Sequence, residues 1–213
     1  MSPFPVILSA PSGGGKTTIA RMLLGKRPDL GYSVSCTTRA PRQGEVPGRD
    51  YYFMSRAEFL AKREEGKFAE SAVVHGNLYG TLKGEVERVL ATGRHVVMDI
   101  DVQGAVQFMR AFPQTVTIFI LPPSAEVLLE RLRARQTESA SQLAARLQSA
   151  LQELQQVAEY EYIVVNDDLE RAVSSVESII DAETVSRERV KNLTRQVGLL
   201  IERLEQEIEN STP

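Results

Sequence analysis

The sequence predicts an α/β fold, in which a parallel sheet is flanked by helices and a small second sheet is inserted into the chain. Four short runs rich in valine and isoleucine are nearly free of polar residues, as in strands buried on both faces of a parallel sheet. Helical patterns follow three of these runs, which is typical of doubly wound folds with right-handed crossovers. Between the first and second runs, glycines and prolines punctuate the chain and predict a separate small element.

The predicted core strands span residues 4–9, 95–99, 116–121 and 162–165. Helices are expected at 17–24 after the first strand, at 125–135 after the third and at 169–185 after the fourth. We therefore divide the chain into a core (1–33 and 84–185), an inserted domain (34–83) and a C-terminal amphipathic helix (186–213).

Length and composition fit an ordinary globular protein. The 213 residues suffice for one well-buried core with an inserted or appended piece, or for two small domains. A net charge of −3 gives no general attraction to nucleic acid or to anionic membranes. No apolar run approaches the ~18 residues of a membrane span, and the N-terminus lacks the basic start of a secretory signal. We expect a cytoplasmic protein that binds neither nucleic acid nor membranes.

The first predicted strand runs into a glycine-rich turn, which is followed by lysine, threonine and a helix. Such a turn puts successive N–H groups on one concave side, and the helix directs the positive end of its dipole to the same spot. The lysine reaches the outer phosphates of a nucleoside triphosphate, and the first threonine hydroxyl holds Mg²⁺. The usual pattern is broken only at the first glycine position, which is alanine. The loop comprises Ala10, Pro11, Ser12, Gly13, Gly14, Gly15, Lys16, Thr17 and Thr18.

Residues 32–83 predict a small mixed sheet with one helix at 56–65. An insertion here overhangs the carboxyl ends of the core strands, where ligands bind in open α/β sheets. Near its start, Arg39 and Arg42 lie in a hydroxyl-rich loop that precedes several tyrosines. The guanidinium fork suits phosphate oxygens, so these residues predict either a second phosphate site or a solvated basic loop. A triphosphate site beside a monophosphate site favours phosphoryl transfer between the two.

Other groups in the insertion suit guanine. The carboxylate of Glu70 can accept hydrogen bonds from guanine N1–H and its exocyclic amine, and the hydroxyls of Ser35 or Thr81 suit O6. Adenine presents the wrong pattern, and unpaired buried polar groups are costly. Whether these groups converge is left open by the sequence.

Two acids end the second predicted core strand. Asp99 suits a carboxylate that assists Mg²⁺ from the end of a core strand. Asp101 lies two positions further on, and it either faces the same crevice or caps the following helix.

Residues 131–151 are expected to be irregular, because a polar centre with few apolar anchors lies between arginines. Such a segment suits a mobile lid, which we place at about 124–150. In the C-terminal helix, apolar residues recur at steps of three and four from Val190 to Leu204, with Ile208 one position off the pattern. This helix either docks on its own core or pairs with another subunit to form a homo-oligomer.

Six motifs, taken in order, closely resemble those of guanylate kinases, and the resemblance runs from about residue 5 to about residue 180. They are Ser-Ala-Pro-Ser-Gly-Gly-Gly-Lys-Thr at 9–17, Ser-Cys-Thr-Thr-Arg-Ala-Pro-Arg-Gln-Gly-Glu at 35–45, Gly-Arg-Asp-Tyr-Tyr-Phe at 48–53, Gly-Asn-Leu-Tyr-Gly-Thr at 76–81, Asp-Ile-Asp-Val-Gln-Gly at 99–104 and Val-Asn-Asp-Asp-Leu at 165–169.

The resemblance implies a P-loop kinase core, a GMP-binding domain at about 34–83 and a lid. It also implies transfer of the γ-phosphoryl group of Mg-ATP to GMP, with catalytic charge supplied by Lys16, Arg39, Arg135 and Arg146. Asn166 would lie near the ATP adenine, and Thr17 and Asp99 near Mg²⁺. The implied GMP-binding residues are Ser35, Arg39, Arg42, Glu45, Tyr51, Glu70, Tyr79, Thr81, Asp99 and Asp101.

Two alternatives to this function remain at this point. One is a P-loop kinase for another acceptor, which a screen of nucleoside monophosphates would separate. The other is a non-catalytic scaffold that keeps the same fold. Scaffold relatives typically have a degraded phosphate loop, whereas Lys16 and Thr17 are present here.

Overall fold

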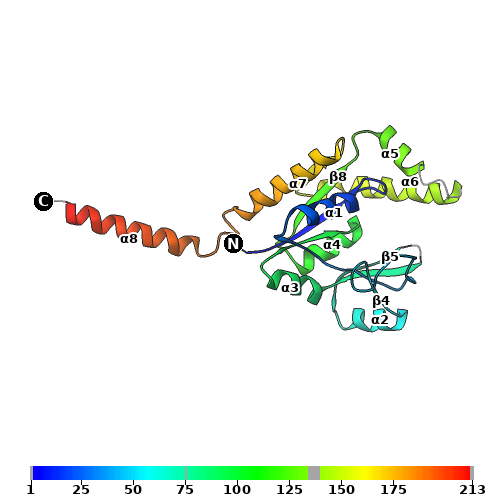
Figure 1. Cartoon of the computed structure of the whole chain (residues 1–213), viewed down its shortest axis with the longest axis horizontal. Helices are drawn as coiled ribbons and strands as arrows, with labels where there is room; N and C mark the ends of the chain where they lie inside the picture. Colours follow the sequence, from blue (N-terminus) through cyan, green and yellow to red (C-terminus); the bar gives the residue numbers. More distant parts are fainter. Residues whose placement is uncertain (1, 75, 134–139, 212–213) are drawn as a thin grey trace.

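The structure, a computed structural model, describes residues 2–74, 76–133 and 140–211 (Figure 1). Its larger sheet has five strands in the order β2-β7-β1-β8-β9, and every neighbouring pair is parallel. These strands are β1 (Pro5–Ser9), β2 (Leu30–Tyr32), β7 (His95–Asp99), β8 (Val116–Leu121) and β9 (Tyr162–Val165). The four predicted strands are therefore confirmed. The fifth, β2, has no apolar run, and its central Gly31 leaves room for Val89 of a neighbouring helix, because a Cβ at position 31 would lie 2.4 Å from Val89 Cγ1.

Helices cover both faces of this sheet. The helices α1 (Lys16–Lys26) and α7 (Leu169–Thr184) pack on one face, where Val6 and Leu8 share a buried cluster with Ile19 and Val176. On the other face, α3 (Lys83–Ala91) and α4 (Val102–Ala111) pack against residues such as Ile7 and Met98. Burial on both faces explains the uninterrupted apolar runs, and the predicted α/β class is confirmed. The sequence predicts no bounds for α3 and α4, although it leaves open a helix after Asp101, because both helices are short and contain helix-weakening glycines.

The second sheet lies beside the core (Figure 1) and has the order β4-β3-β6-β5. Its strands are β3 (Cys36–Thr37), β4 (Tyr52–Phe53), β5 (Phe68–Val74) and β6 (Asn77–Leu82). The pair β3–β4 is parallel and the other pairs are antiparallel, so the predicted mixed sheet is confirmed. The predicted helix is α2 (Arg56–Glu64), which begins at the capping residue Ser55 and buries Phe59 against Leu78.

The expectation of an irregular segment at 131–151 is wrong for its described part. The chain forms α5 (Ala125–Arg133) and α6 (Ala140–Gln155), followed by the short 3-10 helix η1 (Val157–Glu159). Leu128, Leu132 and Ala150 are buried between α5 and α6, and Leu143 and Leu154 pack against them. These few apolar residues have helical spacing, but the many polar residues around them hid the pattern. The predicted lid arginine Arg135 lies outside the described residues.

The C-terminal helix α8 (Leu193–Ser211) projects away from the body of the molecule (Figure 1). None of its residues is buried, so the alternative in which it docks on its own core is wrong. The chain is held to the core up to Arg189, whose guanidinium lies 4.1 Å from the centre of the Phe4 ring and pairs with Glu183. Asn192, in the left-handed conformation, then turns the chain into α8. Within the described ranges, no helix is long and apolar enough to cross a membrane.

Candidate active site

An open cavity of about 1300 Å³ lies between the carboxyl ends of the core strands, the second sheet and α6. In open α/β sheets, ligands bind in the crevice at the carboxyl ends of the strands. Predicted site residues that line the cavity are Pro11, Ser12, Gly13, Gly14, Gly15, Lys16, Thr17, Thr18, Ser35, Arg42, Tyr51, Glu70, Tyr79, Asp99, Asp101 and Arg146.

The phosphate loop has a conformation that its glycines make possible. Gly13 and Gly15 are left-handed, with φ of 85° and 95°, and the amide of Gly14 donates to the Pro11 carbonyl at 2.7 Å. A Cβ on Gly14 would lie 2.7 Å from that of Ala10. Ala10 itself is buried in the core cluster below the loop. Its φ is not positive, so alanine fits where the usual pattern has glycine. The helix α1 begins directly at Lys16 and points its N-terminus at the cavity.

Asn166 supports the loop from below. Its side-chain Nδ2 donates to the Gly14 carbonyl at 2.9 Å, and its backbone N–H donates to the Leu121 carbonyl at the end of β8. A Cβ on Gly15 would lie 2.6 Å from Asn166 Nδ2. Asn166 is buried and does not line the cavity. It contacts the phosphate loop, and its expected position near the ATP adenine stays a prediction.

At the end of β7, Asp99 links α1 to β2. The hydroxyl of Thr17 donates to Asp99 Oδ2 at 2.6 Å, and the hydroxyl of Tyr32 donates to Asp99 Oδ1 at 2.9 Å. Burial, followed by the charge of Asp99, raises the pKa of Tyr32, so this hydroxyl stays protonated and remains a donor. The sequence analysis missed Tyr32, because nothing in the Leu-Gly-Tyr segment marks it as a residue at a strand end.

The predicted second phosphate site is a cluster around Arg39. The guanidinium makes two hydrogen bonds to the Glu45 carboxylate, at 3.0 and 2.7 Å, and a third to the Tyr79 hydroxyl at 3.1 Å. It also lies over the ring of Tyr51, 5.4 Å from its centre. The backbone amide of Arg42 donates to the same Glu45 carboxylate. Hydrogen bonding to Arg39 lowers the pKa of Glu45, so the cluster contains a firmly ionised carboxylate.

Glu70 lies on β5 in a tightly enclosed position. Thr81 on β6 donates to Glu70 Oε1 at 2.7 Å, and both side chains are buried. A Cβ on Gly104 of α4 would lie 2.9 Å from Glu70 Oε2, so only glycine leaves room for this carboxyl group. Burial raises the pKa of Glu70 to about 7; the Thr81 hydrogen bond opposes this shift, and the charge of Asp101 adds to it.

Asp101 has both of its predicted roles. It lines the cavity, and its Oδ1 accepts the Gly104 amide at 2.8 Å, which caps the N-terminus of α4. The capping alternative is thus confirmed together with the placement in the crevice.

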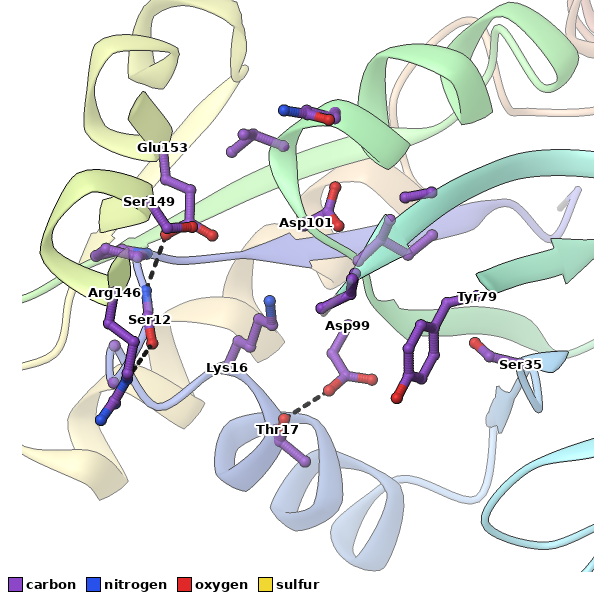
Figure 2. Close-up of a pocket in the computed structure, with 18 of the residues that line it drawn as sticks. Ser12, Lys16, Thr17, Ser35, Tyr79, Asp99, Asp101, Arg146, Ser149 and Glu153 are labelled. Atoms are coloured by element: carbon purple, nitrogen blue, oxygen red, sulfur yellow. Dashed lines mark hydrogen bonds between the residues drawn. The ribbon is translucent and has the colours of Figure 1, made fainter. Parts of the chain in front are cut away.

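Two arginines from the helices α5 and α6 reach the loop. Arg146 donates to the Leu132 carbonyl at 2.9 Å and to the Ser12 hydroxyl at 3.3 Å. Arg131, which the sequence does not assign to the site, lines the cavity and donates to the Asn166 carbonyl at 3.3 Å. Figure 2 shows Lys16 pointing from the loop into the space between α6 and the end of β7.

The remaining predicted residues sit one layer behind the cavity wall in the described part of the chain. Ala10, Arg39, Glu45, Thr81 and Asn166 do not line the cavity, but each lies against a residue that does. The cavity therefore has the glycine-rich phosphate loop at one end and a carboxylate, hydroxyls and basic groups at the other.

Comparison with known proteins agrees with this arrangement. The sequence model of the family described as guanylate kinase matches residues 2–183. The chain belongs to the guanylate kinase family. A curated relative from Rhizobium meliloti, named guanylate kinase, is 48% identical over 199 residues, which cover 92% of this chain and 91% of the relative. Another from Methylococcus capsulatus is 46% identical over 183 residues and covers 86% and 90% of the two chains.

A solved structure supports the same assignment. The crystal structure of guanylate kinase from Anaplasma phagocytophilum superposes with a TM-score of 0.74 at 36% identity, and covers 91% of this chain and 93% of the other. The match to the guanylate kinase family ends at residue 183, within α7. It thus includes both sheets and the whole cavity, and leaves α8 outside.

Proposed function

We propose that the chain transfers the γ-phosphoryl group of ATP to GMP, giving ADP and GDP, in the cavity described above. Membership of the guanylate kinase family supports this reaction. The observation that carries it is geometric, because one cavity joins the phosphate loop at Lys16 to the buried Glu70 and to Tyr79 of the Arg39 cluster. Donor and acceptor phosphates can therefore meet in one cavity.

Catalysis in this proposal comes from alignment and charge rather than from a covalent intermediate. Fixing the two nucleotides side by side supplies much of the rate enhancement. The migrating group spreads negative charge over its oxygens, and cationic side chains neutralise it. Lys16 and Arg146 line the cavity for this purpose, and Arg39 acts from the acceptor side. We assign the same role to Arg135, which lies outside the described residues.

The acceptor is held at both ends. Its phosphate is bound by Arg39, Arg42, Tyr51 and Tyr79. In the structure, the Arg39 guanidinium hydrogen-bonds to the Glu45 carboxylate. Ionised Glu70 accepts hydrogen bonds from guanine N1–H and its amine, while Ser35, Thr81 and Asp101 complete the set of polar groups around the base. A base with the opposite donor pattern leaves Glu70 unpaired in a buried place, which gives selectivity for guanine.

The residues near the loop also suit Mg²⁺. Thr17 and Asp99 offer a hydroxyl and a carboxylate oxygen that already lie 2.6 Å apart, and magnesium prefers oxygen ligands. Among the described residues no group of three or more histidine, cysteine, aspartate or glutamate side chains is placed to hold a metal. This fits an ion that is bound mainly through nucleotide phosphates and water, with Thr17 and Asp99 as its protein partners. When bound, Mg²⁺ supplies positive charge to the phosphates.

The domain division follows from the same reaction. We propose that residues 34–83 form the GMP-binding domain and residues 124–150 the lid, and that their closure excludes water from the transferring phosphate. A cytoplasmic location, and the expectation that the protein binds neither nucleic acid nor membranes, stay predictions from the sequence.

We also propose that α8 pairs with α8 of a second copy. Exposed apolar residues Val197, Ile201, Leu204 and Ile208 form one stripe along it. In an antiparallel pair centred on this stripe, Val197 faces Ile208 and Ile201 faces Leu204.

A coupled assay of ADP release tests the reaction. With ATP and Mg²⁺, GMP should support rapid ADP formation, whereas AMP, CMP and UMP should support little. Preference for another monophosphate would instead favour a kinase of a different acceptor. Absence of ADP formation with all four, while ATP still binds, would favour the non-catalytic scaffold.

A further inference from the structure

Two polar groups of Ser12, its backbone amide and its hydroxyl, bind to one helix. The Ser12 amide donates to Glu153 Oε2 at 3.0 Å, and its hydroxyl accepts from Arg146 Nε at 3.3 Å (Figure 2). Glu153 and Arg146 are seven residues apart on α6, which is close to two helical turns, so their side chains lie on one face. The helix α6 therefore makes two hydrogen bonds to a single residue of the phosphate loop.

This contact connects three elements of the site. Arg146 also donates to the Leu132 carbonyl at the end of α5, and it is almost fully buried. Glu153 lines the cavity with Lys16 and Asp101, and its carboxylate meets a backbone donor of the loop itself. A hydrogen bond to an ionised carboxylate is among the stronger kinds in proteins. The orientation of α6 and the position of the loop amide are thus coupled.

We propose that Glu153 is a positioning residue for ATP, which holds the phosphate loop in register with α6 and with the guanidinium of Arg146. The proposal rests on the proposed function, because it assumes that the loop binds the ATP phosphates. Without the Glu153 bond, the longer contact from Arg146 to the Ser12 hydroxyl remains. The loop amides and Arg146 then have to be ordered at the moment of ATP binding, which weakens binding.

A different role would have the opposite effect. If the Glu153 carboxylate only occupied the place of a phosphate oxygen, ATP would have to displace it, and removal of Glu153 would tighten ATP binding. The two-point contact argues against this role, because Arg146 on the same helix face holds the same serine through its side chain. A carboxylate that only occupied the place of a phosphate oxygen would not need Arg146 to bind the same serine.

The test uses Glu153→Ala, Glu153→Gln and wild type in the coupled assay, with KM measured separately for each nucleotide. Glu153→Ala should raise KM for ATP roughly tenfold and leave KM for GMP within about twofold, as expected for loss of one charge-assisted hydrogen bond at the donor site. Glu153→Gln should recover most of this loss, because the glutamine Oε1 can accept the same amide. The matched control is Glu130→Gln, which removes an exposed carboxylate from neighbouring α5 and should change neither KM.

Direct titration with ATP and melting curves complete the test. An unchanged or lower KM for ATP in Glu153→Ala would overturn the proposal, as would an equal rise of both KM values. Failure of Glu153→Gln to recover ATP binding would overturn it too, because glutamine retains the acceptor. If Glu153→Ala does not fold, the glutamine variant and the ATP titration still decide. Wild type that binds ATP but forms no ADP with GMP refutes the proposed function, while the titration continues to test Glu153.

Discussion

The hydroxyl of Thr17 donates to Asp99 Oδ2 at 2.6 Å, although the two residues are 82 positions apart in the chain. Thr17 belongs to the first turn of α1, and Asp99 ends β7, the neighbour of β1 in the sheet. The parallel register places Asp99 opposite Leu8, just before the phosphate loop begins. The topology of the sheet therefore brings a hydroxyl and a carboxylate together beside the phosphate loop.

This pair predicts how the enzyme depends on magnesium. Asp99→Asn keeps the size of the side chain and removes its charge, so the Mg²⁺ concentration that gives half-maximal activity should rise about tenfold. The affinity for ATP measured by titration should become less dependent on Mg²⁺ as well. Tyr32→Phe removes one hydrogen bond to Asp99 and keeps the charge, so it serves as the matched comparison and should have a smaller effect. Equal magnesium dependence in Asp99→Asn and wild type would contradict the role of Asp99.

The cationic groups should matter for turnover more than for folding. Lys16→Ala or Arg39→Ala should lower kcat by roughly two to three orders of magnitude, because each removes positive charge from the migrating phosphoryl group. Melting temperatures should stay close to wild type, since neither side chain belongs to a buried apolar cluster. Arg49→Ala is the control, because Arg49 is an exposed arginine of the same insertion that pairs with Asp50. A near-normal rate in Lys16→Ala or Arg39→Ala would refute the role given to that residue.

Glu70 predicts the pH dependence of GMP binding. Burial raises its pKa to about 7 from 4.5, and only the ionised carboxylate accepts hydrogen bonds from guanine. KM for GMP should therefore fall as pH rises from 6 to about 8, with up to about a tenfold change per unit below pH 7. Glu70→Gln should bind GMP weakly, with a KM that varies little with pH. Because GMP titrates identically with both proteins, the variant also controls for ionisation of the substrate phosphate.

The same shift affects stability with a definite sign. A folded-state pKa above the unfolded value means that the folded chain binds more protons between pH 4.5 and 7. The free energy of unfolding should therefore decrease across this window as pH rises, by at most about 3 kcal/mol from Glu70 alone. Glu70→Gln should lose this contribution, and denaturant unfolding at pH 5 and pH 8 checks it. A variant whose stability changes with pH as much as that of wild type would contradict the assignment.

Local patterns explain which parts of the site were predictable. The phosphate loop is contiguous, and its strand, glycines, lysine and helix follow one another in the sequence. Asp99 and Asp101 were recognised because they end an apolar strand. Tyr32 and Glu153 carry no such local signal. Tyr32 depends on a three-residue strand, and Glu153 meets Ser12 from a position 141 residues away.

The errors in the fold have a similar cause. The sequence of α6 predicts an irregular segment, because polar residues outnumber the few, such as Ala150, that pack against α5. Its helical state depends on packing against α5, and packing between elements is not visible in a single window of sequence. The role of α8 was undecided for the same reason, since an amphipathic stripe does not say which surface covers it.

The exposed α8 allows a clean test of self-association. Truncation after Asn192 removes α8 and keeps Arg189, which holds the end of the ordered core through Phe4 and Glu183. Because no residue of α8 is buried, kcat, both KM values and the melting temperature of the core should stay near those of the full chain. The mass in solution, measured by light scattering or sedimentation, should fall to that of a monomer. Leu204→Glu places a charge in the middle of the apolar stripe and should have the same effect in the full chain, while Gln206→Glu, on another face of α8, should leave the assembly intact. A full chain that is already monomeric at micromolar concentration would refute the pairing of α8.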